Sequence, residues 1–487
     1  MENVKISERE ERLKKLLELR TQGIATYPAK SHKNAAVSDV VVNFGKLEAE
    51  KREVTVAGRI RLKRAFGNLI FCTLQDGAEQ IQIALSKKDL GAEAHKTFNK
   101  YIDMADFIEV TGTCFVTHKG ENSILVTSWS LLSKALLPLP EKFHGLSDEE
   151  ERLRKRYLDI VMHNDLRDIF VKRAKFWEVT RNFLKERGFL EVETPTIEVT
   201  TGGAEANPFK THHNDFDIDV FMRISIGELW QKRLMAAGFE KTFEIGRAYR
   251  NEGSSPDHLQ EFTNMEFYWA YADYNDGMKL ARELYLKIAN EVFGTTKFSS
   301  RGYEFDLADE WTSIDYRTEV LDKTGIDVLT ATENEMLTKL AELGVKSDAQ
   351  NKERMIDSLW KYCRKKIAGP AFLVRHPKLI APLSKESAEF PGTVEKFQII
   401  LCGSEIGNGY SELNDPLDQR ERFEAQQKLL EAGDEEAMMP DWDFVEMLEH
   451  GMPPTFGFGF GERLFAALSG KTLREVTLFP LMKPKKS

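Results

Sequence analysis

The sequence predicts an α+β protein in which a small β-barrel domain precedes a larger domain built on an antiparallel sheet flanked by helices. The chain has 487 residues, a length that usually divides into two or three domains. Short runs of alternating apolar and polar residues, typical of strands, fill residues 53–135. Beyond residue 145, helical patterns mix with strands that lack regular βαβ spacing, which favours an antiparallel sheet over a doubly wound fold.

The composition is that of a globular protein without a membrane segment. Charged residues make up 30% and hydrophobic residues 41% of the chain, which provides apolar material for a large core. No run of about 18 apolar residues occurs, and the charged start of the chain lacks the apolar core of a signal peptide. The 4 cysteines lie far apart, without a Cys-x-x-Cys pair, and predict neither disulfides nor zinc. We therefore expect a cytoplasmic protein that does not contact a membrane.

The net charge of −10 argues against a general nucleic-acid binder, because neutralising phosphates requires surplus lysine and arginine. Basic residues nevertheless gather in one segment, at Lys51, Arg52, Arg59, Arg61, Lys63 and Arg64. This segment either faces a polyanion or forms a strand edge whose charges are solvated.

The first domain is predicted over residues 1–145. It begins with an amphipathic helix within residues 1–30. About five short strands follow in residues 53–135, and strands of this length and spacing typically close into a barrel. A proline-containing connector at residues 137–140 leads to the second domain, predicted over 146–487.

Two strands of the second domain carry polar residues on one face. The first strand ends at Arg250, and Glu252 follows it; a turn containing His258 then leads to a second strand that begins near Phe262. Strand alternation places Glu266 and Tyr268 together on one face of this second strand, and Met265, Phe267 and Trp269 on the other. The polar face therefore offers a carboxylate and a phenol to a ligand.

Two further segments are candidates for the same site. Asn408 and Glu412 share strand parity in a segment with little side-chain bulk, and Glu405 joins them only if the Gly407–Gly409 stretch is bulged. The alternative is an acidic loop facing solvent. Glycines alternate with phenylalanines over 457–461, and Arg463 then opens a helix, which places a cation where the backbone approaches a ligand. Close backbone packing alone would also explain these glycines.

These segments resemble the signature motifs of class II aminoacyl-tRNA synthetases. Residues 250–262 are similar to motif 2, residues 457–463 to motif 3, and residues 189–195 to motif 1, which builds the dimer interface in that family. Within the class, the similarity is to lysyl-tRNA synthetases, through residues 202–203, 211–214, 268–274 and 405–415. Residues 53–135 resemble the OB-fold anticodon-binding domain of that family.

The resemblance implies a homodimeric lysine–tRNA ligase that converts L-lysine and ATP into lysyl-adenylate and transfers the lysyl group to tRNA(Lys). One alternative is an aspartyl- or asparaginyl-type synthetase, which Glu266 and Glu412 disfavour because they would repel an acidic substrate. Another is a paralogue that does not charge tRNA, which leaves the barrel domain without a use. A third, an inactive scaffold, is disfavoured by the presence of Arg250 and Arg463.

The resemblance also implies roles for individual residues. The ATP site would contain Arg250, Glu252, His258, Phe262, Glu405 and Arg463. Among these, Arg250 and Arg463 are the expected catalytic residues: Arg250 holds the α-phosphate, and Arg463 covers the adenine opposite Phe262. The lysine pocket would contain Gly203, Glu228, Glu266, Tyr268, Asn408 and Glu412. Here Glu228 pairs with the α-ammonium and Glu412 with the ε-ammonium.

The expected cofactor is Mg²⁺, held by Glu405 and by position 398. The chain departs from the family there, since Gln398 supplies an amide where the family has a second carboxylate. In the barrel, Phe71 would stack on an anticodon base, Gln82 would read it, and Lys63 and Arg64 would hold phosphate. The alternative for Phe71 is a core aromatic residue. Ser128 stands where many relatives have an acid that reads the anticodon.

Overall fold

The computed structural model describes residues 2–140, 146, 148–204, 206–253, 255, 258–345, 351–434 and 437–485, with side chains from residue 7 onward. The chain divides into two compact units, Met1–Arg167 and Asp168–Ser487. The domain boundary predicted at residue 145 lies outside the described residues. Within the part of the chain that is described, no helix combines the length and apolar composition needed to cross a bilayer.

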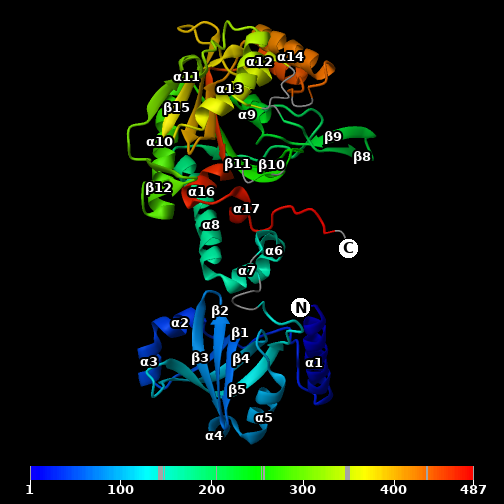
Figure 1. The fold of residues 1–487 in the computed structure, drawn as a ribbon, viewed down its shortest axis with the longest axis vertical. Helices are drawn as coiled ribbons and strands as arrows, with labels where there is room; N and C mark the ends of the chain where they lie inside the picture. The colour runs from blue at the N-terminus through cyan, green and yellow to red at the C-terminus, as the bar shows by residue number, and fades with distance from the viewer. Residues whose placement is uncertain are drawn as a thin grey trace. The chain divides into compact units, whose positions relative to one another are not determined.

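The first unit is built around a closed five-stranded barrel, drawn in blue to cyan in Figure 1. Its strands follow the order β1-β2-β3-β5-β4, with bounds β1 Glu53–Phe66, β2 Leu69–Asp76, β3 Glu79–Ser86, β4 Phe107–Val116 and β5 Asn122–Ser133. Its helices are α1 Glu2–Thr21, α2 Val37–Val42, α3 Phe44–Ala49, α4 Lys87–Leu90, α5 Ala92–Tyr101, α6 Glu149–Arg154 and α7 Arg156–Met162. The predicted barrel is thereby confirmed.

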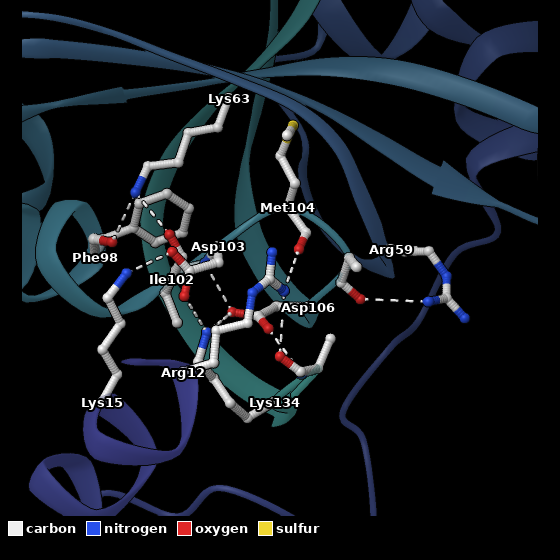
Figure 2. A network of polar contacts seen from close by, with 12 residues as sticks. Arg12, Lys15, Arg59, Lys63, Phe98, Ile102, Asp103, Met104, Asp106 and Lys134 are labelled. Carbon is white, nitrogen blue, oxygen red and sulfur yellow. Dashed lines mark hydrogen bonds and ion pairs between the residues drawn. The ribbon is translucent and has the colours of Figure 1, made fainter. Parts of the chain in front are cut away.

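A network of buried charges fastens α1 to the barrel, as Figure 2 shows. The fully buried Lys134 Nζ lies 2.5 Å from Asp103 Oδ2 and 2.8 Å from Asp106 Oδ2. From α1, Lys15 reaches Asp103 Oδ1 at 2.6 Å, and Arg12 donates to two backbone carbonyl groups. Because a buried charge is costly unless it is paired, these contacts define one position for the helix.

The second unit contains an eight-stranded sheet in the order β14-β15-β16-β17-β18-β11-β10-β6. The bounds are β6 Leu190–Glu191, β10 Lys241–Tyr249, β11 Glu261–Ala270, β14 Thr312–Asp315, β15 Ala371–Pro377, β16 Thr393–Leu401, β17 Ser404–Ser411 and β18 Thr455–Gly461. Small sheets pair β12 Lys297–Ser300 with β13 Tyr303–Asp306, and β9 Ile218–Met222 with both β7 Ile197–Glu198 and β8 Lys210–His213.

Helices cover the large sheet. They are α8 Asn164–Lys185, α9 Glu228–Ala236, α10 Tyr274–Ile288, α11 Tyr316–Thr324, α12 Glu333–Glu342, α13 Lys352–Arg364, α14 Pro416–Glu431, α15 Trp442–Glu449, α16 Glu462–Ser469 and α17 Leu473–Val476, with a π-helical turn at Ala289–Phe293 and a 3₁₀ turn at Lys378–Ile380. On one face of the sheet, Phe456, Phe458 and Phe460 of β18 pack against Leu284 and Tyr285 of α10 in the main core. The opposite face of β18, which this core does not cover, carries the candidate site described below.

The large sheet is antiparallel from β15 to β10, as predicted, but its two edges are parallel. Strand β14 runs parallel to β15, and β6 runs parallel to β10. A parallel pair needs a long crossover, and the chain between β14 and β15 supplies one through helices α11, α12 and α13. The sheet is therefore mixed, within the α+β class that the sequence predicts.

Candidate active site

A cavity of about 510 Å³ opens on the glycine-bearing face of the large sheet, and a second of about 270 Å³ shares part of its lining. The structure brings all the residues predicted for the ATP and lysine sites to these cavities. The first is lined by Gly203, Glu228, Arg250, Glu252, His258, Glu266, Tyr268, Gln398, Glu405, Asn408, Glu412 and Arg463. Phe262 lines the second, together with Arg250 and Arg463.

The cavity exists because glycines stand opposite its polar side chains. Gly457 of β18 pairs with Tyr268 of β11, and a Cβ at Gly457 would lie 2.1 Å from Glu412 Oε1. Gly203 has φ +90°, and a Cβ there would lie 2.7 Å from Glu228 Cβ. Neither position leaves room for a side chain, so both glycines are required by close approach.

A β-bulge brings Glu405 to the cavity. Ile399 of β16 pairs with Gly407, whereas the next residue, Ile400, pairs with Glu405, so β17 contains one extra residue at Ile406. The Ile406 side chain is buried in the core. The bulge therefore shifts Glu405 onto the face that carries Asn408, which is the condition set by the strand parity of the sequence.

A buried lysine joins two of the predicted carboxylates, and the sequence analysis missed it. Lys232 is only 1% exposed, and its Nζ lies 2.8 Å from Glu228 Oε1 and 2.5 Å from Glu412 Oε2. Burial lowers the pKa of Lys232, but the two carboxylates outweigh it, and the net pKa is raised. Tyr410 donates its hydroxyl to the same oxygen of Glu228. The spacing of Glu228 and Lys232, four residues apart on α9, was the available signal.

The pocket holds more carboxyl groups than Lys232 pairs with. Burial and the charge of Glu228 raise the pKa of Glu266 to about 7, and burial raises the pKa of Glu412 as well. Its carboxylate accepts hydrogen bonds from Ile226 N at 2.9 Å and from the Tyr268 hydroxyl at 3.2 Å. Within the described residues, Glu412 Oε1 and Asn408 Oδ1 are buried without a hydrogen-bond partner. Buried acceptors of this kind suit a cationic ligand with several N–H donors.

The other end of the cavity carries the two arginines. Arg250 follows β10, donates from Nε to the carbonyl of Ile224 at 3.3 Å, and lies with its guanidinium carbon 5.4 Å from the centre of the Phe262 ring. Burial lowers the pKa of Arg250, although glutamates nearby oppose the shift. Arg463 lies in the first turn of α16 and lines both cavities. The two arginines and the Phe262 ring make this end of the cavity suitable for an anionic ligand that contains an aromatic group.

Similarity to known proteins identifies the family of the chain. The family described as tRNA synthetases class II (D, K and N) matches residues 148–483, and an OB-fold nucleic acid binding domain matches residues 54–132. A protein of Thermotoga maritima named lysine–tRNA ligase is 43% identical over 484 residues, 98% of this chain and 96% of its own length. A Roseiflexus protein of the same name is 43% identical over 482 residues, 98% of each chain. The chain belongs to the class II tRNA synthetases.

Both predicted Mg²⁺ ligands have a protein partner on one oxygen. Glu405 Oε1 accepts from Trp360 Nε1 at 2.8 Å and pairs with Arg364 Nη1 at 2.6 Å. Gln398 Oε1 lies 3.1 Å from Nε2 of His376, whose pKa burial lowers to about 3, so the imidazole is neutral. Among the described residues, no three acidic, histidine or cysteine side chains form a group that could hold a metal. The residues do not fit a protein-held ion.

The predicted anticodon residues lie in the synthetase's barrel. Residues paired across antiparallel strands share a face, and Phe71 of β2 pairs with Arg64 of β1, whereas Lys63 pairs with the buried Cys72. Phe71 is half-buried and lies outside the barrel core, which excludes the core-aromatic alternative. The side-chain amide of Gln82 donates to Ser123 Oγ at 2.8 Å.

The ammonium group of Lys63, in contrast, is bound within the barrel domain. Its ammonium donates to the carbonyl groups of Phe98, Asn99 and Ile102, at 3.3, 2.8 and 2.7 Å, at the end of α5 (Figure 2). Burial lowers the pKa of Lys63. All three N–H donors of a lysine are thereby used, and a phosphate contact would require Lys63 to release them.

Proposed function

We propose that this synthetase is a lysine–tRNA ligase, which activates L-lysine with ATP and transfers the lysyl group to the 3′ end of tRNA(Lys). The carrying observation is the charge of the pocket: three buried glutamates, Glu228, Glu266 and Glu412, surround a single internal ammonium. The unpartnered oxygen of Glu412 and the carboxyl group of Glu266 suit the second ammonium of a diamine, whose positive charge favours the ionised form of both. An aspartate side chain would meet repulsion there.

The reaction needs no protein nucleophile. A carboxylate oxygen of lysine attacks the α-phosphorus of ATP, the bond to the bridging oxygen breaks, and pyrophosphate leaves with that oxygen. Arg250 stabilises the charge that develops on the α-phosphate, and Arg463 and Phe262 hold the nucleotide. A ribose hydroxyl of the tRNA then attacks the lysyl carbonyl, its proton is lost, and AMP leaves. Positioning and charge stabilisation account for the rate. The Mg²⁺ that accompanies ATP enters as part of the substrate.

ATP–pyrophosphate exchange, measured with each of the 20 amino acids in turn, tests the substrate. We expect exchange with lysine, and rates with aspartate or asparagine no higher than without an amino acid. Exchange that depends on aspartate or asparagine would overturn the proposal in favour of the relatives of that specificity. Exchange with lysine but without tRNA charging would indicate a paralogue of another function.

The pH dependence of lysine use should report Glu266. Its pKa of about 7 is raised above the ordinary value by burial, so the carboxyl is neutral below pH 7 and charged above it. Because the charged form attracts an ammonium, kcat/KM for lysine should rise as pH increases through about 7. Exchange kinetics on both sides of this value measure the rise, which Glu266→Gln should abolish.

Glu198 provides the control for this titration. Burial raises its pKa to about 7 as well, but its side chain accepts from Trp230 and lies outside both cavities. Glu198→Gln should therefore keep the rise. A rise that persists in Glu266→Gln and vanishes in Glu198→Gln would contradict the assignment.

We also propose that the barrel binds the tRNA anticodon through Phe71, Arg64 and Gln82. Removing a stacked aromatic ring costs roughly 1–3 kcal/mol, so Phe71→Ala should raise KM for tRNA about 5- to 150-fold. Lysine-dependent exchange, which needs no tRNA, should stay unchanged. Phe107→Ala on β4, an exposed aromatic with a different strand partner, is the control. An equal effect of both substitutions on charging would assign Phe71 to barrel stability.

The assembly that we propose is a cytoplasmic homodimer. Its support is the segment that resembles motif 1 and the residues just after it, where three large apolar side chains are exposed: Leu190 at 49%, Ile197 at 58% and Val199 at 66%. Apolar side chains gathered on a surface mark contact sites in many proteins. Light scattering of Ile197→Lys should then show a monomer, whereas the parent should have twice that mass.

A further inference from the structure

The carboxylate of Glu405 is held by two donors from one helix. Trp360 and Arg364 lie four residues apart on α13, and their Nε1 and Nη1 atoms reach Glu405 Oε1 at 2.8 and 2.6 Å. Trp360 is fully buried, and its ring packs 5.2 Å from that of Tyr316, which fixes the donor. The negative charge of Glu405 is thus already paired with that of Arg364.

Position 398 also carries no negative charge for a cation. The amide oxygen of Gln398 accepts from Nε2 of His376 at 3.1 Å, and the same amide group offers two N–H donors. Donors of this kind contact anions and are not metal ligands. Gln398 pairs with Asn408 across β16 and β17, and both line the cavity beside Glu405. Two positions expected to attract a divalent ion therefore present a neutralised carboxylate and an amide.

The Arg364 guanidinium has hydrogen-bonding capacity to spare. It lines the same cavity as Arg250 and Arg463, and its side chain is 22% exposed. Its Nε is buried without a hydrogen-bond partner in the part of the chain that is described. A guanidinium has five N–H donors, of which Glu405 takes one here. The other donors match the oxygens of a polyphosphate, which guanidinium groups bind in bidentate geometry.

We propose that Arg364 replaces a protein-bound divalent cation at the polyphosphate end of the ATP site. The synthetase then holds no metal of its own at Glu405 and Gln398. The leaving pyrophosphate accepts hydrogen bonds from the N–H groups of Arg364 that Glu405 does not use, and the Mg²⁺ that ATP brings neutralises its charge. An arginine that stabilises the charge of a transferring phosphoryl group is a recurring part of such sites. The inference rests on the proposed use of ATP.

Direct metal binding tests it without reference to activity. Mn²⁺, titrated into the full chain and counted by electron paramagnetic resonance, should show no bound ion at Glu405 without nucleotide. With lysine and α,β-methylene-ATP, the count should be one Mn²⁺ per bound nucleotide. The double variant Arg364→Met/Gln398→Glu, which frees one carboxylate and adds another, should gain an Mn²⁺ site in the absence of nucleotide. Two ions per nucleotide in the parent, or one ion without nucleotide that Glu405→Gln removes, would overturn the proposal.

Exchange kinetics give the second readout. Losing a charged hydrogen-bond donor costs roughly 1.5–3 kcal/mol, so Arg364→Met should raise KM for pyrophosphate about 10- to 150-fold. KM for lysine should change less than twofold, and Arg364→Lys should recover only part of the loss because it lacks the planar fork. Lys365→Gln removes a charge from the exposed residue that follows α13, outside both cavities, and should leave both constants unchanged. A pyrophosphate KM within twofold of the parent in Arg364→Met would reject the role.

The two failures are distinguishable. Absence of lysine-dependent exchange in the parent would reject the proposed function, whatever the metal count. Lysine-dependent exchange together with a protein-bound Mn²⁺ at Glu405 would keep the function and reject the inference.

Discussion

Arg250→Gln should lower the rate of lysine-dependent ATP–pyrophosphate exchange by roughly a thousandfold or more, the effect of removing an arginine from a phosphoryl-transfer site. The substitution removes the charge that we propose to face the α-phosphate and leaves the Phe262 ring in place, so nucleotide binding should weaken much less than the rate. Arg250→Lys should recover little, because the guanidinium is positioned through its Nε contact to Ile224 and lysine cannot reproduce the fork. Rapid-quench measurement of lysyl-adenylate formation separates rate from binding.

Arg247 is the matched control for this substitution. It lies on the same strand, β10, but its side chain is 42% exposed and lies 3.5 Å from Glu261, outside both cavities. Arg247→Gln should keep the parental exchange rate. If Arg250→Gln retains more than a tenth of the parental rate, Arg250 does not contact the reacting phosphate.

Glu412→Gln should raise KM for lysine several hundredfold while KM for ATP changes little. The substitution removes a carboxylate whose oxygen Oε1 is buried without a partner and faces the pocket. A buried ammonium that loses its carboxylate costs about 3–5 kcal/mol, equivalent to a factor of hundreds or more. Isothermal titration with lysine and exchange kinetics measure this change directly.

Substitution of Lys232 distinguishes the loss of a substrate contact from the collapse of the pocket. Lys232→Met leaves two facing carboxylates without their shared cation, so it should also weaken lysine binding. Because Glu412 and Lys232 are in contact, the double variant should lose less than the two single losses combined. Additive losses would mean that the pair is not coupled. An unchanged lysine KM in Glu412→Gln would exclude Glu412 as the ε-ammonium partner.

Local patterns predicted the fold wherever neighbours in sequence are neighbours in the structure. Strand alternation placed Glu266 and Tyr268 on the site face of β11, and strand parity required a bulge for Glu405, although the extra residue is Ile406 and not within 407–409 as predicted. The parallel edges were not predictable this way, since β6 and β14 pair with strands more than 50 residues later in the chain. Pairing across such a distance depends on packing, which no local pattern records.

The same limit applies to the site. Lys232 meets Glu412, and Arg364 meets Glu405, between segments far apart in the sequence, which local patterns do not record. Only the spacing of Glu228 and Lys232 on α9 gave a local signal. Parity would have separated Lys63 from Arg64, because adjacent strand residues point to opposite faces. The family resemblance assigned both Lys63 and Arg64 to a phosphate of the tRNA. Side-chain direction within a strand is thus a useful check on residue roles transferred from relatives.

The alternation of phenylalanine and glycine in β18 has a consequence for how variation is tolerated. Phe456, Phe458 and Phe460 fill the core, whereas a Cβ at Gly457, Gly459 or Gly461 would come within 3 Å of a side chain of the site. In a mutational scan that records cellular abundance and growth separately, truncated phenylalanines should deplete the protein itself. Alanine at the glycines should leave a fully abundant but inactive protein. Along this one strand, alternate residues would be selected for the abundance of the protein and for its catalytic activity.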